Sequence, residues 1–467
     1  MKLTNLFGGN TEKESDKFKV VKGNDLDYFK EYAKDFKERY VVGKLYKSMK
    51  NKNGRLVSIV GLRNTGKTIA GLQVLWKLGL EVGITNCAYI EVREDCEVKE
   101  LEELILSLKE EYIFVDEITR VKLFIDKGYL ISDILDSTNK SIMITGTDSL
   151  SIILASRSSL NHRMITYSTV PITFSEAKEV LGIEYDEYTN IGGFTSELTN
   201  DEILEIPVEN IVNTIANNFD YSEYNDLKLT KSVIRSIIFY IYYMVIVEKI
   251  SNIKKLKLNR FGKNTDEEEE EIIRSKIGII DRFNSRQLNY MLEKCEDLQV
   301  VDELGNEVQN SKRLTKFYIN SPAITMAYLN KFKDILHSLG KVCKSELPTQ
   351  LKGDLFECVV LNEIYDLDVS FFEAEYEIDF IVYLNSGRKY IAVECKDVSS
   401  YDRLKRVESL TKNEAKCAYK LIVTTLDIED KNKFLRLQET DKTIEVVNIL
   451  NFRKRINELL EELEEKE

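Results

Sequence analysis

The chain has 467 residues, enough for two to four domains that each bury a core of their own. Its 43% hydrophobic and 31% charged residues are typical of a soluble globular protein, and its formal net charge of −13 excludes a chain that binds nucleic acid over its whole surface. Seven cysteines without a CxxC pair favour a reduced, cytoplasmic setting. We expect no signal peptide, because the first residues lack a long apolar core. We also expect no membrane span, because the most apolar stretch, residues 237–247, is too short to cross a bilayer.

A phosphate-binding motif stands early in the chain. Residues 61–68, GLRNTGKT, fit the spacing G-x-x-x-x-G-K-[ST]. The apolar run 56–60 predicts a strand before the motif, and residues 68–78 predict a helix after it, which is the context that the motif requires. Its glycines let backbone N–H groups turn toward phosphate oxygens at the positive end of the new helix. The predicted nucleotide-binding residues of the loop are Gly61, Arg63, Asn64, Thr65, Gly66, Lys67 and Thr68.

Two side chains of this motif have expected chemical roles. Lys67 would reach the β- and γ-phosphates, and the Thr68 hydroxyl would hold Mg²⁺. The alternative is a chance match in a glycine-containing loop, against which the flanking strand and helix argue.

Strand-like and helix-like segments alternate after the motif. Residues 88–92, 112–115 and 141–147 are apolar, strand-like runs, and residues 98–109 have helical apolar spacing. This alternation predicts an α/β domain with a parallel sheet, in which ligands bind at the carboxyl ends of the strands.

Two carboxylates end the strand-like run 112–115. Asp116 is expected to hold the Mg²⁺ shell, and Glu117 to orient and deprotonate the attacking water. Thr145 or Thr147, at the tip of the next strand, would sense the γ-phosphate, and a plain strand-end turn is the alternative.

Two arginines, Arg157 and Arg163, are candidates for neutralising charge in the transition state. An arginine finger acting between subunits would require a homo-oligomer. A surface salt bridge is the alternative for each arginine.

The middle of the chain predicts helices followed by a hairpin. Residues 201–218, 231–250 and 284–295 have helical spacing, and residues 298–301 and 315–319 read as two strands. Helix followed by hairpin is the outline of a winged helix, which binds DNA through one helix or serves as a structural spacer. The last predicted helix carries Arg286 and Lys294 but also Glu293, so the spacer or a weak DNA contact is favoured.

The C-terminal third carries a second set of charged residues. Glu357 lies in a predicted helix over 353–363, Asp379 lies near the start of a predicted strand over 377–382, and Glu394 and Lys396 alternate on another strand over 390–396. Converging strand carboxylates can bind Mg²⁺ or Mn²⁺, which would activate water for attack on a phosphodiester. The lysine could position that water. The alternative is a domain that only binds DNA or a partner chain, with its charged residues retained as a buried network.

The combined pattern resembles a known family. The stretches GLRNTGKT, IFVDEI, IMITGTDSL, SLNHRM, VPITFSEAKEVLG and IGGFT cover most of residues 55–195. They resemble AAA+-like ATPases of bacteria and archaea that join a P-loop domain to a winged helix and a restriction-endonuclease-like C-terminal domain. Asp379, Glu394 and Lys396 stand in the positions of the PD-(D/E)xK nuclease core, with Glu357 on the preceding helix. The resemblance implies ATP as the nucleotide.

The sequence therefore predicts an α/β protein with four parts. They are an N-terminal extension (1–40), a P-loop ATPase domain (41–200), a helical and winged-helix region (201–345) and a PD-(D/E)xK nuclease-like domain (346–467). The predicted function is ATP binding and hydrolysis coupled to a nuclease-like domain that acts on DNA. One alternative is a regulatory NTPase switch whose third domain only binds protein or nucleic acid. Another is a DNA-binding regulator built on the winged helix.

Overall fold

The computed structural model describes most of the first half of the chain and separate segments of the second half. The described residues are 17–26, 30, 38–147, 149–194, 198–218, 235, 238–239, 242, 246, 292–297, 315–319, 321–338, 349–367, 369–373, 377–384, 389–396, 417–425 and 444–464. The predicted strand 298–301 and Arg286 lie outside these residues. Within the described ranges, no helix is both long and apolar enough to cross a membrane.

The chain divides into two compact units. The first comprises Met1–Ile172 and Phe194–Ile234, and the second comprises Thr173–Gly193 and Arg235–Glu467. The sequence placed the end of the ATPase domain at residue 200. In the structure, residues 173–193 pack instead with the helices of the second unit.

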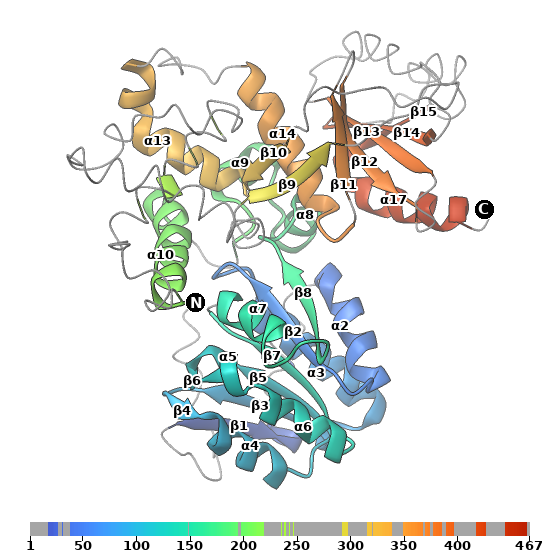
Figure 1. The fold of residues 1–467 in the computed structure, drawn as a ribbon. Coiled ribbons are helices and arrows are strands. Elements are labelled where there is room, and N and C mark those ends of the chain that lie inside the picture. The colour runs from blue at the N-terminus through green and yellow to red at the C-terminus, as the bar shows by residue number, and fades with distance from the viewer. Residues whose placement is uncertain are drawn as a thin grey trace. The chain divides into compact units, whose positions relative to one another are not determined.

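A six-stranded sheet forms the centre of the first unit, in the order β1-β3-β5-β7-β2-β8 (Figure 1). Every neighbouring pair is parallel except β1 and β3. All residues of β2, β5 and β7 are buried, as expected for parallel strands covered on both faces. The strands are β1 (Phe18–Lys22), β2 (Leu56–Gly61), β3 (Cys87–Val92), β5 (Tyr112–Asp116), β7 (Ser141–Thr145) and β8 (Met164–Thr169), with a separate pair β4 (Cys96–Glu97) and β6 (Val121–Lys122).

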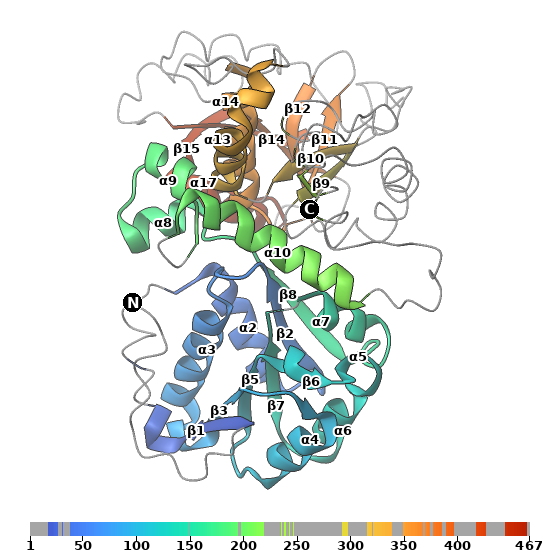
Figure 2. The same cartoon turned by 90° about the vertical axis from the view of Figure 1, so that its left-hand side faces the viewer.

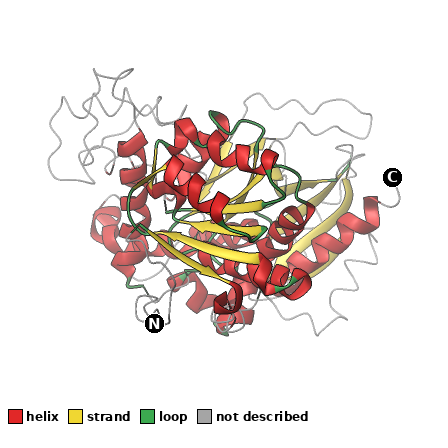
Figure 3. Cartoon of the chain, turned by 90° about the horizontal axis from the view of Figure 1, so that it is seen from below, coloured by secondary structure: helices red, strands yellow, loops and turns green. Residues whose placement is uncertain are grey.

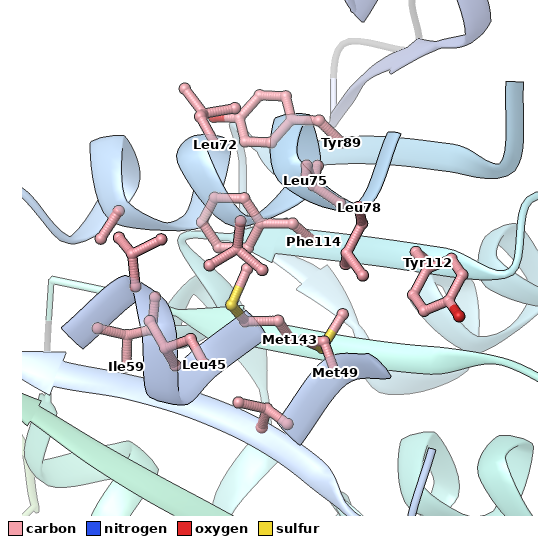
Figure 4. Packing of buried hydrophobic residues seen from close by; sticks show 14 of the residues in the cluster. Leu45, Met49, Ile59, Leu72, Leu75, Leu78, Tyr89, Tyr112, Phe114 and Met143 are labelled. Carbon is pink, nitrogen blue, oxygen red and sulfur yellow. The ribbon is translucent and has the colours of Figure 1, made fainter. Parts of the chain in front are cut away.

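Helices cover both faces of this sheet, giving the layered α/β arrangement seen in Figures 2 and 3. One face carries α2 and α3, and the other carries α4, α5, α6 and α7 (Figure 2). The helices are α2 (Tyr40–Asn51), α3 (Lys67–Val82), α4 (Val98–Ser107), α5 (Phe124–Lys127), α6 (Tyr129–Ser137), α7 (Ser149–Arg157) and α10 (Asn200–Asn218). Short 3₁₀ turns are η2 (Gly23–Leu26), η3 (Ile84–Asn86) and η4 (Ile118–Arg120). The core between α2, α3 and the sheet is drawn in Figure 4.

The second unit contains a seven-stranded mixed sheet in the order β10-β9-β11-β12-β13-β14-β15. Its strands are β9 (Leu292–Asp297), β10 (Thr315–Ile319), β11 (Val369–Glu373), β12 (Glu377–Tyr383), β13 (Tyr390–Cys395), β14 (Cys417–Thr424) and β15 (Ile444–Asn448). Its helices are α8 (Phe174–Leu181), α9 (Tyr185–Ile191), α13 (Pro322–Ser338), α14 (Thr349–Glu363) and α17 (Ile449–Glu464). The second unit is therefore also an α/β structure.

One predicted helix is wrong at its C-terminal end. Residues 292–295, within the helix predicted over 284–295, belong to strand β9. This strand pairs antiparallel with β10 and parallel with β11, so both of its edges form ladder hydrogen bonds. Tertiary pairing of this kind overrides local helical spacing. Glu293 and Lys294 therefore lie in a central strand and not on a recognition helix.

A buried carboxylate fastens α8 to α14 in the second unit. The backbone N–H of Ser175 donates to Glu363 over 2.8 Å, and the Ser175 hydroxyl donates to the other oxygen of the same carboxylate. Thr173 caps α8 in a capping box with Glu176. Burial raises the pKa of Glu363 to about 7, against the lowering effect of its hydrogen bonds from Ser175. The carboxylate is therefore costly to ionise in the folded state.

We predict that Glu363 makes the stability of the second unit fall as the pH rises. Unfolded Glu363 ionises near pH 4.3, whereas the folded group retains its proton until about pH 7. Its contribution to the free energy of unfolding is therefore complete below pH 4 and is lost between about pH 4.5 and 7, a change of about 4 kcal/mol. Chemical denaturation at pH 5 and 7.5 should show a smaller loss in Glu363→Gln than in the wild type. The exposed Glu461, changed to Gln, is the control, and equal losses in wild type and Glu363→Gln would refute the prediction.

Candidate nucleotide-binding site

The phosphate-binding loop joins β2 to α3 in the first unit. Gly66 stands at the N-cap of α3 with φ 76°, a left-handed conformation that favours glycine. At Gly61, an added Cβ would lie 2.3 Å from the Thr169 hydroxyl oxygen and 2.4 Å from the Thr169 carbonyl oxygen. The loop therefore requires glycine at both positions, one for its turn and one for its close approach to β8. The strand, loop and helix that the sequence predicted here are confirmed.

Lys67 is buried beneath this loop. Its ammonium donates to the carbonyl oxygens of Gly61, over 3.1 Å, and Leu62, over 2.8 Å. Burial lowers its pKa to about 8, although nearby Glu117 and Asp116 raise it. The side chain is thus held at the loop by carbonyl groups, and its charge is incompletely compensated.

Hydrogen bonds tie the loop to the end of β8. The Thr65 hydroxyl donates to the carbonyl of Leu62 over 2.8 Å and lies 3.1 Å from the hydroxyl of Thr169. The buried guanidinium of Arg39 donates to the carbonyl of Thr65 over 2.7 Å and to that of Val170 over 3.3 Å. Arg39 thus fixes the loop from outside the motif.

The two remaining predicted loop residues lie toward the surface. Arg63 is exposed, and Asn64 is partly buried with φ 63°. The backbone conformation of Asn64 is one that asparagine adopts more readily than most residues.

Asp116 ends β5 and accepts hydrogen bonds at both carboxylate oxygens. Oδ2 accepts from the Thr68 hydroxyl over 2.8 Å and from the Tyr89 hydroxyl over 3.2 Å, and Oδ1 accepts from the Glu117 N–H over 2.9 Å. Burial and then Glu117 raise the pKa of Asp116 to about 6, and the three hydrogen bonds oppose this rise. The structure therefore brings together Thr68 and Asp116, which are both oxygen donors of the kind that Mg²⁺ prefers.

Glu117 follows Asp116 in a left-handed conformation, with φ 57°. Backbone strain of this kind is common at functional sites, where the surroundings hold it in place. The Thr147 hydroxyl donates to Glu117 over 2.7 Å, and the Thr147 N–H donates over 3.1 Å. Thr145 is buried instead, and its hydroxyl donates to the carbonyl of Ile59 within the sheet. Of the two threonines, Thr147 is the one in contact with Glu117.

The candidate arginines differ in their surroundings. Arg163 pairs with Asp133 over 2.5 Å and with Asp136 over 2.6 Å. This is the surface salt bridge that stood as the alternative to an arginine finger. Arg157 is exposed at the last turn of α7.

The charged residues predicted in the second unit lie around Cys395. The Cys395 N–H donates to Asp379 over 2.7 Å, and the Lys396 ammonium lies 2.6 Å from Glu394 and 4.0 Å from Asp379. Burial raises the pKa of the Cys395 thiol, and Asp379, Glu357 and Glu394 raise it further. The Glu357 carboxylate accepts from the Tyr318 hydroxyl over 2.7 Å.

Lys396 lies between the carboxylates of Glu394 and Asp379 and donates a hydrogen bond to Glu394. Burial lowers the pKa of Lys396, but Glu394 and Asp379 raise it above its ordinary value. Among the residues that the structure describes, no three His, Cys, Asp or Glu side chains are grouped so that they could hold a metal ion.

Sequence reasoning did not select Arg39 or Tyr89. Arg39 precedes α2, and Tyr89 lies in an apolar strand-like run where an aromatic residue predicts only core packing. The long-range contacts of both residues could not be read from local spacing. A tyrosine among the apolar residues of β3, whose hydroxyl needs a partner when buried, was the one available signal.

Residues 53–178 match the family model of the AAA domain. This part of the chain is a P-loop nucleotide-binding domain of the AAA type. The sheet order and the geometry of the loop agree with that assignment. The domain comprises the loop, Asp116, Glu117 and Thr147.

Similarity to other known proteins is slight. No curated protein sequence matches the chain. Among solved structures, C. elegans PCH-2 shares 11% identity over 58% of this chain and 75% of that chain, with a TM-score of 0.25. Domain III of the replication initiation protein DnaA from Thermotoga maritima shares 14% identity over 49% of this chain and 93% of that chain, with a TM-score of 0.22. Protein VC1899 from Vibrio cholerae shares 13% identity over 87% of this chain and 97% of that chain, with a TM-score of 0.19. Scores this low carry no argument about function.

We predict that nucleotide affinity falls as the pH rises through about 8. The pKa of Lys67 is about 8 without nucleotide, so the ammonium loses its proton above that pH. Phosphate groups favour the charged form, so binding near pH 8 should take up a proton. Calorimetric titration in two buffers of different ionisation enthalpy measures this uptake directly. If neither the nucleotide affinity nor the proton uptake changes between pH 7 and 9.5, Lys67 is not the group that binds the phosphates.

Proposed function

We propose that the first unit is an Mg²⁺-dependent ATPase. One observation carries the proposal: hydrogen bonds link Thr68, Asp116, Glu117 and Thr147 at the carboxyl ends of β2, β5 and β7. The buried Lys67, which donates to two carbonyl groups of the phosphate-binding loop, precedes Thr68. Ligands bind at this edge of a parallel sheet. Adenine is proposed as the base because the sequence resembles AAA+-like ATPases and because no NKxD-type guanine-reading motif stands at a strand end.

The residues of this site suit a magnesium nucleotide. Lys67 and the backbone N–H groups at the start of α3 would bind the phosphates. The Thr68 and Asp116 oxygens, 2.8 Å apart, would hold Mg²⁺. When bound, Mg²⁺ would neutralise part of the charge on the phosphate groups.

Glu117 is the proposed general base. Each carboxylate oxygen can accept more than one hydrogen bond, so the bonds from Thr147 leave capacity for a water molecule. The Glu117 carboxylate would orient the attacking water and take its proton. Thr147 would hold the base in place and, at the tip of β7, would sense the γ-phosphate.

We predict that Glu117→Gln separates binding from turnover. The phosphate-binding loop is unchanged in this variant, so ATP affinity should remain close to that of the wild type. Loss of a general base typically costs 10²–10⁴-fold, so the turnover rate should fall by about 100-fold or more. Phosphate release and fluorescent-nucleotide binding measure the two quantities, and Glu103→Gln, exposed on α4, is the matched control. Normal turnover in Glu117→Gln would place the base elsewhere.

A second candidate function is cleavage of DNA by the second unit. It is favoured by the approach of Lys396 to both Glu394 and Asp379, the three residues that the resemblance places in a PD-(D/E)xK core. The donor types fit Mg²⁺ or Mn²⁺, but among the described residues the carboxylates are not grouped so that three of them could hold one metal ion. The alternative role is binding of DNA or a partner chain.

We predict that any cleavage by the second unit depends on Asp379. A mixed panel of DNA and RNA substrates, incubated with Mg²⁺ or Mn²⁺ and with or without ATP, should be cut by the wild type and not by Asp379→Ala. Lys77→Ala, exposed on α3, controls for general effects of substitution. No cleavage by a wild type that still turns over ATP would leave a regulatory ATPase whose second unit only binds.

A further inference from the structure

Tyr89 connects the hydrophobic core of the first unit to the nucleotide site. Its side chain is 5% exposed, and its ring centroid lies 5.5 Å from that of Phe114. Both rings belong to the core cluster drawn in Figure 4. The Tyr89 hydroxyl donates to Oδ2 of Asp116 over 3.2 Å.

The register of the sheet explains how a core residue reaches this carboxylate. Strands β3 and β5 run parallel, with Tyr89 opposite Phe114. Phe114 and Asp116 are two residues apart on β5 and so point to the same face of the sheet. A tyrosine packed on Phe114 therefore extends its hydroxyl along that face toward Asp116.

A phenylalanine would fill the same space without a buried hydroxyl. Burying a hydroxyl costs free energy unless it is hydrogen-bonded, and here the bond goes to the carboxylate that adjoins Thr68. The hydroxyl thus restrains the rotation of the Asp116 carboxylate.

Asp116 is restrained from three directions. The Thr68 hydroxyl comes from α3, the Glu117 N–H from the chain itself, and the Tyr89 hydroxyl from β3. A Thr68 oxygen that holds a cation has one fewer lone pair available, and its proton must point away from that cation. The hydrogen bond from Tyr89 involves no proposed cation ligand other than Asp116 itself.

We propose that Tyr89 is a positioning residue that holds Asp116 in the orientation needed for the Mg²⁺ of a bound nucleotide. This inference rests on the proposed function. Tyr89 does not touch the nucleotide in this account and acts only through Asp116. Groups that orient metal ligands in this way typically contribute 10–100-fold to metal affinity.

The test compares Tyr89→Phe with Tyr112→Phe. Tyr112→Phe also removes a tyrosine hydroxyl from the same core cluster. Tyr112 stands at the first residue of β5, whereas Asp116 stands at the last. A fluorescent, non-hydrolysable ATP analogue is titrated in EDTA, and Mg²⁺ is then titrated at a fixed analogue concentration. In Tyr89→Phe, affinity in EDTA should stay within about 2-fold of the wild type, and the Mg²⁺ midpoint should rise by about 10-fold or more. Tyr112→Phe should match the wild type in its affinity in EDTA and in its Mg²⁺ midpoint.

The outcomes separate the inference from the proposed function. An Mg²⁺ midpoint in Tyr89→Phe equal to that of the wild type would overturn the role of Tyr89. An equal loss of affinity in EDTA and in Mg²⁺ would overturn it as well, because the change would then reflect the shape of the site. Thermal unfolding of both variants confirms that the core is retained. A wild type that binds no nucleotide, or that binds it without regard to Mg²⁺, would contradict the proposed Mg²⁺-dependent ATPase and the inference together. An unchanged Mg²⁺ midpoint in Tyr89→Phe, beside a wild type whose binding responds to Mg²⁺, would contradict the inference alone.

Discussion

The nucleotide site is organised around two charged side chains buried close to each other at the edge of the sheet. Burial lowers the pKa of Lys67 to about 8 and raises that of Asp116 to about 6, so burial disfavours the charged form of each group, although both remain mostly charged at neutral pH. Neither charge is neutralised by a direct ion pair with the other, since Lys67 donates to loop carbonyls and Asp116 accepts from hydroxyl and N–H groups. Triphosphate and Mg²⁺ carry the charges that would compensate both groups. These uncompensated charges support the proposal that the site binds a magnesium nucleotide.

Most of this site could be predicted from the sequence because its parts are local. The loop needs glycine at fixed positions, and the apolar run before Asp116 and Glu117 is a buried strand. A parallel sheet then brings the ends of β2, β5 and β7 to one edge. Arg39 and Tyr89 make further hydrogen bonds to the site from segments that are distant along the chain. Contacts of this kind cannot be predicted from the spacing of apolar residues. For the same reason, the sequence left Thr145 and Thr147 undecided, and the hydrogen bond of Thr145 to Ile59 inside the sheet distinguishes them.

The second unit was less predictable because its structure depends more on long-range pairing. Strands β12 and β13 could be read from alternating residues in the sequence, whereas β9 has the local pattern of a helix end and becomes a strand through pairing on both edges. The chain that follows β8 is a further example. Its helix α8 begins with a capping box between residues three positions apart, Thr173 and Glu176, but the Glu363 that binds Ser175 stands far along the chain. Packing against α14 and α17 assigns this segment to the second unit.

The central claim, that Lys67 binds nucleotide phosphates, is tested most directly by equilibrium binding of ATP to the wild type, Lys67→Ala and Lys77→Ala. Both lysines lie on α3, but Lys77 is exposed and pairs with Glu38. Each hydrogen bond from a charged group contributes about 1.5–3 kcal/mol, so loss of the Lys67 ammonium should weaken binding by roughly 10–100-fold. Lys77→Ala should bind as the wild type does. Equal affinity in all three proteins would contradict the account.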